Sequence, residues 1–148
     1  LYVVNIHFTE EYVVWRKREK GGGLIGTFES YEAATKHLEA QGAALEDHEI
    51  TQTQSHLLLS KNPDTAVLNN TAFIMDFSSS KLRVSREWNT QINQLGGDRF
   101  SSLWKLTAVQ TQNRAAQKFW NLSVENQGWV LEADYEFAKG IYGSVKGA

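Results

Sequence analysis

The sequence has no cysteine, one proline and one methionine. The lack of cysteine excludes a disulfide scaffold and a metal site built from thiolates, and it favours an intracellular setting. No apolar run approaches the roughly 20 residues that a membrane-spanning helix needs, so we expect no membrane association. The 148 residues combine ordinary apolar and charged fractions of 41% and 22%, which predict a single folded domain with its own core.

Motifs of catalysis and metal binding are also missing. The segment GGGLIG lacks the lysine and the serine or threonine that end a phosphate-binding loop, so we interpret it as a hairpin turn. The four histidines, His7, His37, His48 and His56, have no metal-ligand spacing. Asp76 ends an expected strand, and we expect it to help cap the next helix. We therefore expect a protein that is not an enzyme, with no catalytic residue, metal or cofactor.

Two periodicities divide the chain into strands and helices. Apolar and polar residues alternate, as in strands, at 1–8, 11–17, 24–28, 50–59, 71–77, 100–111 and 117–125. Helical spacing follows Ser30, Ser78 and Leu131. Strands and helices do not alternate regularly, which argues against a parallel nucleotide-binding sheet. We expect an α+β fold that is mainly β: a small antiparallel OB-like barrel, or a curved sheet, with about three helices.

The limits of the second expected helix carry the clearest signals. The serines at 78–80 are typical N-cap residues and the glycines at 96–97 typical C-cap residues. The apolar stripe between them consists of Val84, Trp88, Ile92 and Leu95. We treat residues 1–148 as one OB-like domain. Because Leu1 already lies within a strand pattern, we expect it to be the trimmed core of a longer chain.

The net charge of −2 hides an uneven distribution of charge along the chain. Residues 29–49 contain six acids and one lysine, and we call them the acidic segment. Basic side chains gather in the first hairpin and again over 81–118: Arg16, Lys17, Arg18, Lys20, Lys81, Arg83, Arg86, Arg99, Lys105, Arg114 and Lys118. Such a distribution can attract a polyanion to one face and repel it from another.

Aromatic residues lie among the basic ones: Tyr12, Trp15, Trp88, Phe100, Trp104, Phe119, Trp120 and Trp129. Single-stranded nucleic acid is bound by such a combination, because cations pair with phosphates and each base stacked on a ring contributes about 1–3 kcal/mol. Large rings are also ordinary core residues, so the sequence leaves open which tryptophans are buried and which could stack. Trp15, beside four cations at a hairpin end, is the best candidate for stacking.

Four segments resemble, in this order, proteins encoded in bacteriophage replication and recombination modules: IHFTEEYVVWRKREKGGGLIGTF, SSSKLRVSREWN, RFSSLWKLTAVQTQN with FWNLSV, and ADYEFAKGIY. The chain is similar to phage single-stranded-DNA-binding proteins of the OB type. The resemblance implies non-enzymatic coating of single strands during phage DNA replication or recombination, in the cytoplasm of the infected bacterium. It carries over to binding residues at Trp15, Arg16, Lys17, Lys81, Ser85, Arg86 and Trp88.

Charge, aromatics and resemblance together predict sequence-tolerant binding of single-stranded DNA. The expected binding residues are Tyr12, Trp15, Arg16, Lys17, Arg18, Lys20, Lys81, Arg83, Arg86, Trp88, Trp104, Lys105 and Trp120. These residue types do not indicate whether DNA or RNA is preferred, and they do not predict an oligomeric state. Replication or recombination proteins are further expected partners. The alternative is a non-enzymatic protein–protein interaction module, an adaptor in a replication complex or a virion.

Overall fold

A computed structural model of the 148-residue chain describes residues 1–112 and 114–146. Its strands are β1 (Tyr2–Arg16), β2 (Leu24–Phe28), β3 (His48–Lys61), β4 (Phe73–Ser78), β5 (Ser102–Gln112) and β6 (Lys118–Trp129). Its helices are α1 (Tyr31–Ala40), α2 (Leu82–Leu95) and α3 (Glu132–Lys146), with the 3-10 turns η1 (Arg18–Lys20), η2 (Leu45–Asp47), η3 (Ser79–Lys81) and η4 (Arg99–Ser101). Among the described residues, no helix is both long and apolar enough to cross a bilayer.

The strands form one antiparallel sheet that stays open. Its order is β4-β3-β1-β5-β6, and β2 pairs with the far end of β1. The predicted α+β class and the curved antiparallel sheet with three helices are confirmed. The OB-like barrel is wrong, because a barrel closes only when its two edge strands pair, and β4 and β6 remain the edges of this sheet.

β1 is one strand of 15 residues where the sequence predicts two. The polar residues Thr9 and Glu10 interrupt the alternation, yet no glycine or proline breaks the backbone there. Thr9 therefore pairs with Ser55 and Glu10 with Gln54, and the ladder between β1 and β3 continues to the far end. The two strands form a long ribbon.

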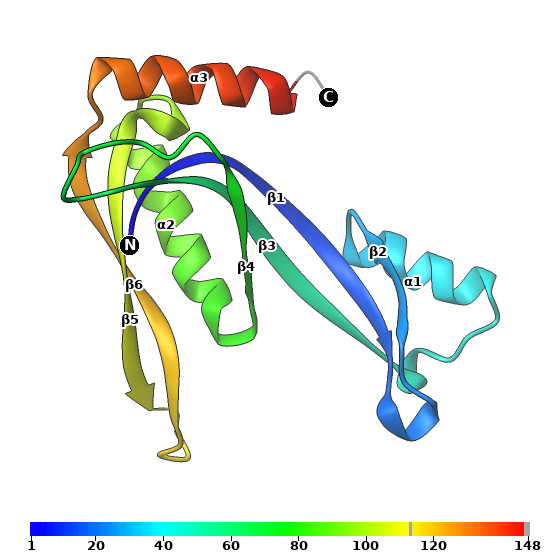
Figure 1. Cartoon of the computed structure of the whole chain (residues 1–148). Coiled ribbons are helices and arrows are strands. Elements are labelled where there is room, and N and C mark those ends of the chain that lie inside the picture. Colours follow the sequence, from blue (N-terminus) through cyan, green and yellow to red (C-terminus); the bar gives the residue numbers. More distant parts are fainter. Residues whose placement is uncertain (113, 147–148) are drawn as a thin grey trace.

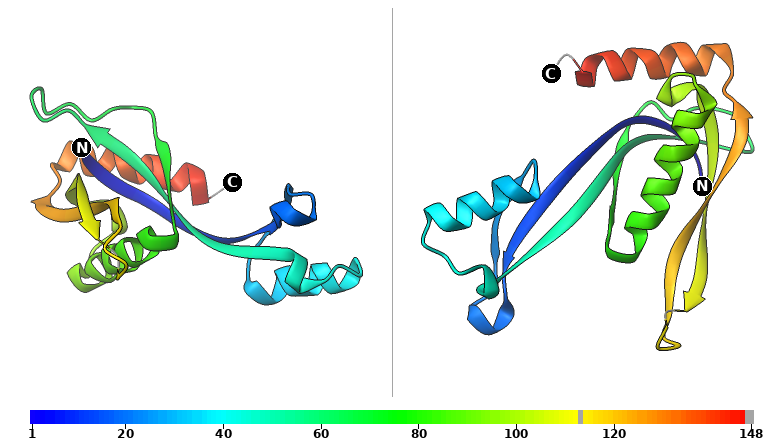
Figure 2. Two further views of the ribbon diagram at one scale, coloured as in Figure 1. Left: turned by 90° about the horizontal axis from the view of Figure 1, so that it is seen from below. Right: turned by 180° about the vertical axis from the view of Figure 1, so that it is seen from behind.

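The molecule has two arms that diverge from a shared body (Figure 1). We call residues 9–55 the ribbon arm; in it β1 and β3 carry β2 and α1 at their far end. We call residues 107–123 the hairpin arm, which is the outer part of β5 and β6. Views from below and from behind place α2 between the two arms and α3 across the body (Figure 2).

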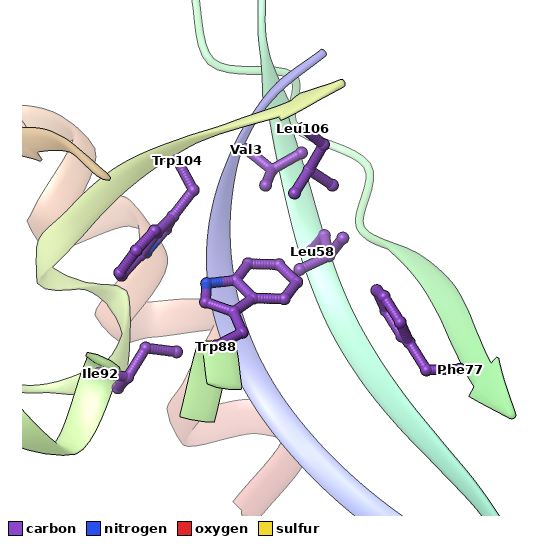
Figure 3. Close-up of a cluster of buried hydrophobic side chains, with 7 residues drawn as sticks. All are labelled: Val3, Leu58, Phe77, Trp88, Ile92, Trp104 and Leu106. Atoms are coloured by element: carbon purple, nitrogen blue, oxygen red, sulfur yellow. The ribbon is translucent and has the colours of Figure 1, made fainter. Parts of the chain in front are cut away.

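Alternate residues of β1 serve opposite faces of the sheet, as a strand requires. Val3 packs towards α2, in a cluster with Leu58, Phe77, Trp88, Ile92, Trp104 and Leu106 (Figure 3). On the other face, Val4 and Ile6 pack with Phe100 and with Ala138 of α3. Further along the strand, Val14 packs with Ala34 and Leu38 of α1. The core is thus spread in three clusters along one strand, which accounts for the extended shape.

Two predicted helix caps are confirmed. The Ser30 side chain accepts a hydrogen bond from the Ala33 backbone N–H at 3.0 Å, at the start of α1. Gly96 ends α2 in the left-handed conformation, with φ of 74°, which an L-residue adopts only at a cost. Both caps depend only on residues next to the helix ends, so the sequence alone is enough to predict them.

The predicted serine cap of α2 is wrong. The chain enters α2 through η3, and no side chain at 78–81 accepts a capping hydrogen bond among the described residues. Asp76 does not cap the helix either: it pairs with Ser55 across β4 and β3 and accepts a hydrogen bond from the Ser55 hydroxyl. The Asp76 carboxylate is therefore bonded to its cross-strand neighbour Ser55 and not to the start of the helix.

Candidate nucleic-acid interface

The turn between β1 and β2 carries Trp15 and four of the predicted cations. Gly21, Gly22 and Gly23 all have positive φ, at 107°, 67° and 106°, where an L-residue loses about 1–2 kcal/mol. The Arg16 N–H donates to the Gly23 carbonyl at 2.9 Å, and the Gly22 N–H donates to the Lys17 carbonyl at 3.0 Å. The three glycines are therefore explained by the geometry of a hydrogen-bonded turn.

The side chains of this turn are open to solvent. Trp15 is 44% exposed. Arg16, Lys17 and Arg18 form no ion pair within the described part of the chain, whereas the Lys20 ammonium lies 3.8 Å from the Asp47 carboxylate. The acidic segment thus lies on the same arm as the basic turn. The sequence had suggested instead that acidic and basic side chains lie on separate faces of the molecule. Three cations remain free for a ligand.

The hairpin arm brings the predicted residues Lys81 and Trp120 together with Lys118, a basic residue that was not among the expected binding residues. Asn121 of β6 donates a hydrogen bond to the Ser80 carbonyl at 3.4 Å, which places η3, with Lys81, beside β6. Lys118 and Trp120 lie two residues apart on β6 and so share a face of the strand. Trp120 is 63% exposed. Neither lysine has an ion-pair partner among the residues described.

Arg83 belongs to the same region but is already paired. Its guanidinium lies 3.1 Å from the Glu87 carboxylate, one helical turn further along α2. Both side chains are well exposed, so this pair is worth little and a phosphate could compete for the arginine.

Three predicted binding residues lie in or near the core. Trp88 and Trp104 are both 0% exposed and pack edge-to-face, with ring centroids 6.0 Å apart. Neither ring presents a face to a base in this structure, so we leave both out of the candidate interface. The sequence left open that these tryptophans are core residues. This possibility is confirmed, because α2 covers the face of β5 that carries Trp104. Lys105 pairs with Tyr2 between β5 and β1, and its ammonium lies over the Tyr2 ring, 6.0 Å from the centroid.

Tyr12 of the ribbon arm and Arg86 of α2 belong to one group of polar side chains. This group also contains the Glu10 carboxylate. The Tyr12 hydroxyl donates to the Glu10 carboxylate at 3.0 Å, and this hydrogen bond is the main cause of the raised pKa of Tyr12. Arg86 donates to the Gln52 side chain at 2.9 Å, and Gln52 in turn donates to Glu10. A phosphate here would meet the Glu10 carboxylate, so this group is a poorer anion site than the arm ends.

A buried chain of hydrogen bonds escaped the sequence analysis. Asn5 donates to Nδ1 of His56 at 2.8 Å, and Nε2 of His56 lies 2.7 Å from the Ser85 hydroxyl. Ser85 donates its single proton to Gln54 at 2.6 Å, so it must accept from His56, which is therefore the neutral Nε2–H tautomer. Gln54 completes the chain by donating to Glu10 at 3.4 Å.

Burial keeps His56 in its neutral form. Burial, and secondarily the Arg99 charge, lower the pKa of His56 from 6.5 to about 3. The His56 ring stacks on Trp88, with centroids 4.8 Å apart and planes 15° apart. Ser85, which the resemblance carried over as a binding residue, is fully buried within these hydrogen bonds, so we leave it out of the candidate interface.

Comparison with known families covers the whole chain. A family model described as Pam3 phage gp34-like protein matches residues 1–148. The chain belongs to this phage family. No curated protein and no solved structure matches it. For a Pam3 phage gp34-like protein, the phage origin implied by the resemblance is supported, and single-strand binding stays a prediction.

One sequence signal could have revealed the buried chain in this gp34-like protein. Asn5 interrupts an apolar run in β1, and His56 precedes the apolar residues 57–59 in β3. Polar residues at such positions are buried only when they are hydrogen-bonded to each other. Their partners lie 51 and 29 residues away, so only the fold identifies them.

Proposed function

We propose that this phage protein binds single-stranded nucleic acid at the ends of its two arms, without altering it chemically. The observation that carries the proposal is an exposed tryptophan among free cations at each arm end: Trp15 with Arg16, Lys17 and Arg18, and Trp120 with Lys81 and Lys118. DNA replication or recombination in the phage is the process in which we place this binding.

Each arm end supplies both contacts that a flexible strand needs. The cations neutralise phosphates and release counterions, which gives affinity without sequence preference. The exposed indoles offer a stacking surface to any base, at about 1–3 kcal/mol per stack. Because Trp15 and Trp120 lie on different arms, a strand that contacts both would cross the space between the arms rather than lie in a barrel groove.

Tryptophan fluorescence during titration with an oligothymidylate, at low salt, tests the proposal. We expect quenching in the wild type, and a smaller quench in Trp15→Phe and in Trp120→Phe. Trp129→Phe is the matched control, because Trp129 is equally exposed, at 64%, but lies at the body end of β6, away from the free cations. The absence of quenching in the folded wild type overturns the proposal, and so does a quench that only Trp129→Phe removes.

A protein–protein module is the second candidate, and a separate observation favours it. Large apolar side chains are exposed where β6 passes into α3: Trp129 at 64%, Leu131 at 62% and Phe137 at 40%. Apolar side chains gathered in this way are typical of docking surfaces. Size-exclusion chromatography with and without oligonucleotide separates the two candidates, because only this one predicts assembly without DNA.

A further inference from the structure

A small pocket lies in the body, among β1, η4 and α3, away from both arm ends. Its volume is about 230 Å³. Its lining consists of His7, Phe8, Asp98, Arg99, Phe100 and Tyr142. Four of these six side chains are rings, Arg99 is the one cation among them and Asp98 the one carboxylate, which accepts a hydrogen bond from the Tyr135 hydroxyl.

The Arg99 guanidinium is half-buried and is held only by uncharged groups. It donates from Nη1 to the Asn5 side-chain oxygen at 3.3 Å and from Nη2 to the Asn89 side-chain oxygen at 2.9 Å. It also lies over the Phe8 ring, 5.5 Å from the centroid. Within the described residues no carboxylate forms an ion pair with Arg99; the neighbouring Asp98 instead accepts a hydrogen bond from the Tyr135 hydroxyl.

No ion pair with a described residue balances the charge of this half-buried guanidinium. Burial lowers the pKa of Arg99, which means that the surroundings disfavour the charged form. Buried charges in folded proteins are normally paired with an opposite charge. Of the five N–H groups of a guanidinium, two are used by the asparagines, so three remain without a partner among the described residues.

The buried hydrogen-bond chain holds Arg99 ready for a ligand. Because Asn5 donates its amide N–H to His56, its amide oxygen must face Arg99. The orientation of the guanidinium is thus fixed before any ligand arrives, which lowers the entropy that binding costs. His7 and Tyr142 line the same pocket, with ring centroids 6.1 Å apart.

We propose that this pocket binds a small oxyanion, a phosphate or carboxylate group, on the Arg99 guanidinium. A planar fork of N–H donors matches both groups, and Arg is the side chain that recognises them by two parallel hydrogen bonds. The ring-lined wall would then contact the apolar part of the molecule that carries the oxyanion. This inference does not depend on strand binding at the arm ends.

The test uses inorganic phosphate as the probe, followed by 15N NMR at constant ionic strength. We expect saturable shifts at the Arg99 Nε–H and at the backbone amides of His7 and Tyr142. Arg99→Gln should weaken apparent phosphate affinity at least tenfold. Arg86→Gln, which removes the same charge from an exposed guanidinium that is also bonded to an amide, should leave the affinity unchanged.

Arg99→Gln also removes the donor to the Asn5 and Asn89 side-chain oxygens, so the wild-type shift map decides the question if the variant does not fold. Shifts confined to the turn at 16–20, or no saturation with either phosphate or acetate, overturn the proposal. A parallel titration with acetate distinguishes the two sources: saturation of the same resonances by acetate but not by phosphate supports a carboxylate ligand. Loss of this binding would leave the oligothymidylate quench at Trp15 and Trp120 unaffected.

Discussion

Acid is expected to destabilise the protein through His56. In the folded chain this ring is buried and neutral, with its pKa lowered from 6.5 to about 3. The unfolded chain takes up a proton on His56 below pH 6.5, whereas the folded chain does not. The unfolded state therefore binds more protons between these two values, and the stability that the neutral ring contributes is lost as the pH falls through this window.

The size of the effect follows from the same values. Each pH unit below 6.5 lowers the free energy of unfolding by up to about 1.4 kcal/mol, so pH 5 costs about 2 kcal/mol relative to neutral pH. Urea unfolding at pH 7 and pH 5, followed by circular dichroism, measures it.

His56→Phe isolates the contribution of the ring's titration. Phenylalanine keeps a ring against Trp88 but cannot take up a proton. It leaves the Asn5 amide N–H without its acceptor and the Ser85 oxygen without its donor, while Asn5 keeps Arg99 and Ser85 keeps Gln54. We expect a variant that is less stable at pH 7, with a loss between pH 7 and pH 5 that is about 2 kcal/mol smaller than in the wild type. An equal pH dependence in both proteins would refute the assignment of a buried, neutral His56.

Two further predictions concern single hydroxyl groups. Ser85→Ala removes the donor to Gln54 inside the core and should lower the free energy of unfolding by about 1–3 kcal/mol. Arg83→Ala, on the exposed side of the same helix, is the control and should change the free energy of unfolding by less than about 0.5 kcal/mol. Ser30→Ala should cost about 1 kcal/mol through loss of the α1 cap, and Ser80→Ala, whose side chain caps nothing, should cost clearly less; thermal unfolding compares the two.

Local signals predicted most of the elements. Alternation located the strands, and the cap at Ser30 and the glycine at 96 fixed two helix limits, because each depends only on neighbouring residues. The joining of 1–8 and 11–17 into one strand was missed, since the polar residues Thr9 and Glu10 break the pattern while their partners in β3 keep the ladder intact.

Non-local packing decided what the sequence left open. Whether the sheet closes depends on a pairing between β4 and β6, which lie far apart in the chain and remain its edges. Trp104 and Trp120 lie on adjacent strands, yet only Trp104 packs in a cluster with Trp88 and Ile92 of α2, so Trp104 is buried and Trp120 is exposed. Burial of a strand residue depends on which helix covers its face, and periodicity alone cannot supply that.

The salt dependence of strand binding tests the central proposal most directly. Fluorescence anisotropy of a labelled oligothymidylate gives the association constant of the wild type and of a triple variant, Arg16→Gln with Lys17→Gln and Arg18→Gln, over a range of salt. Each lost phosphate contact reduces the slope of log K against log salt by about 0.7, so the triple variant should show a slope shallower by about 2. Lys36→Gln, on the exposed side of α1, is the control and should keep the wild-type slope. Wild-type binding that ignores salt, or a triple variant with an unchanged slope, would contradict the proposal.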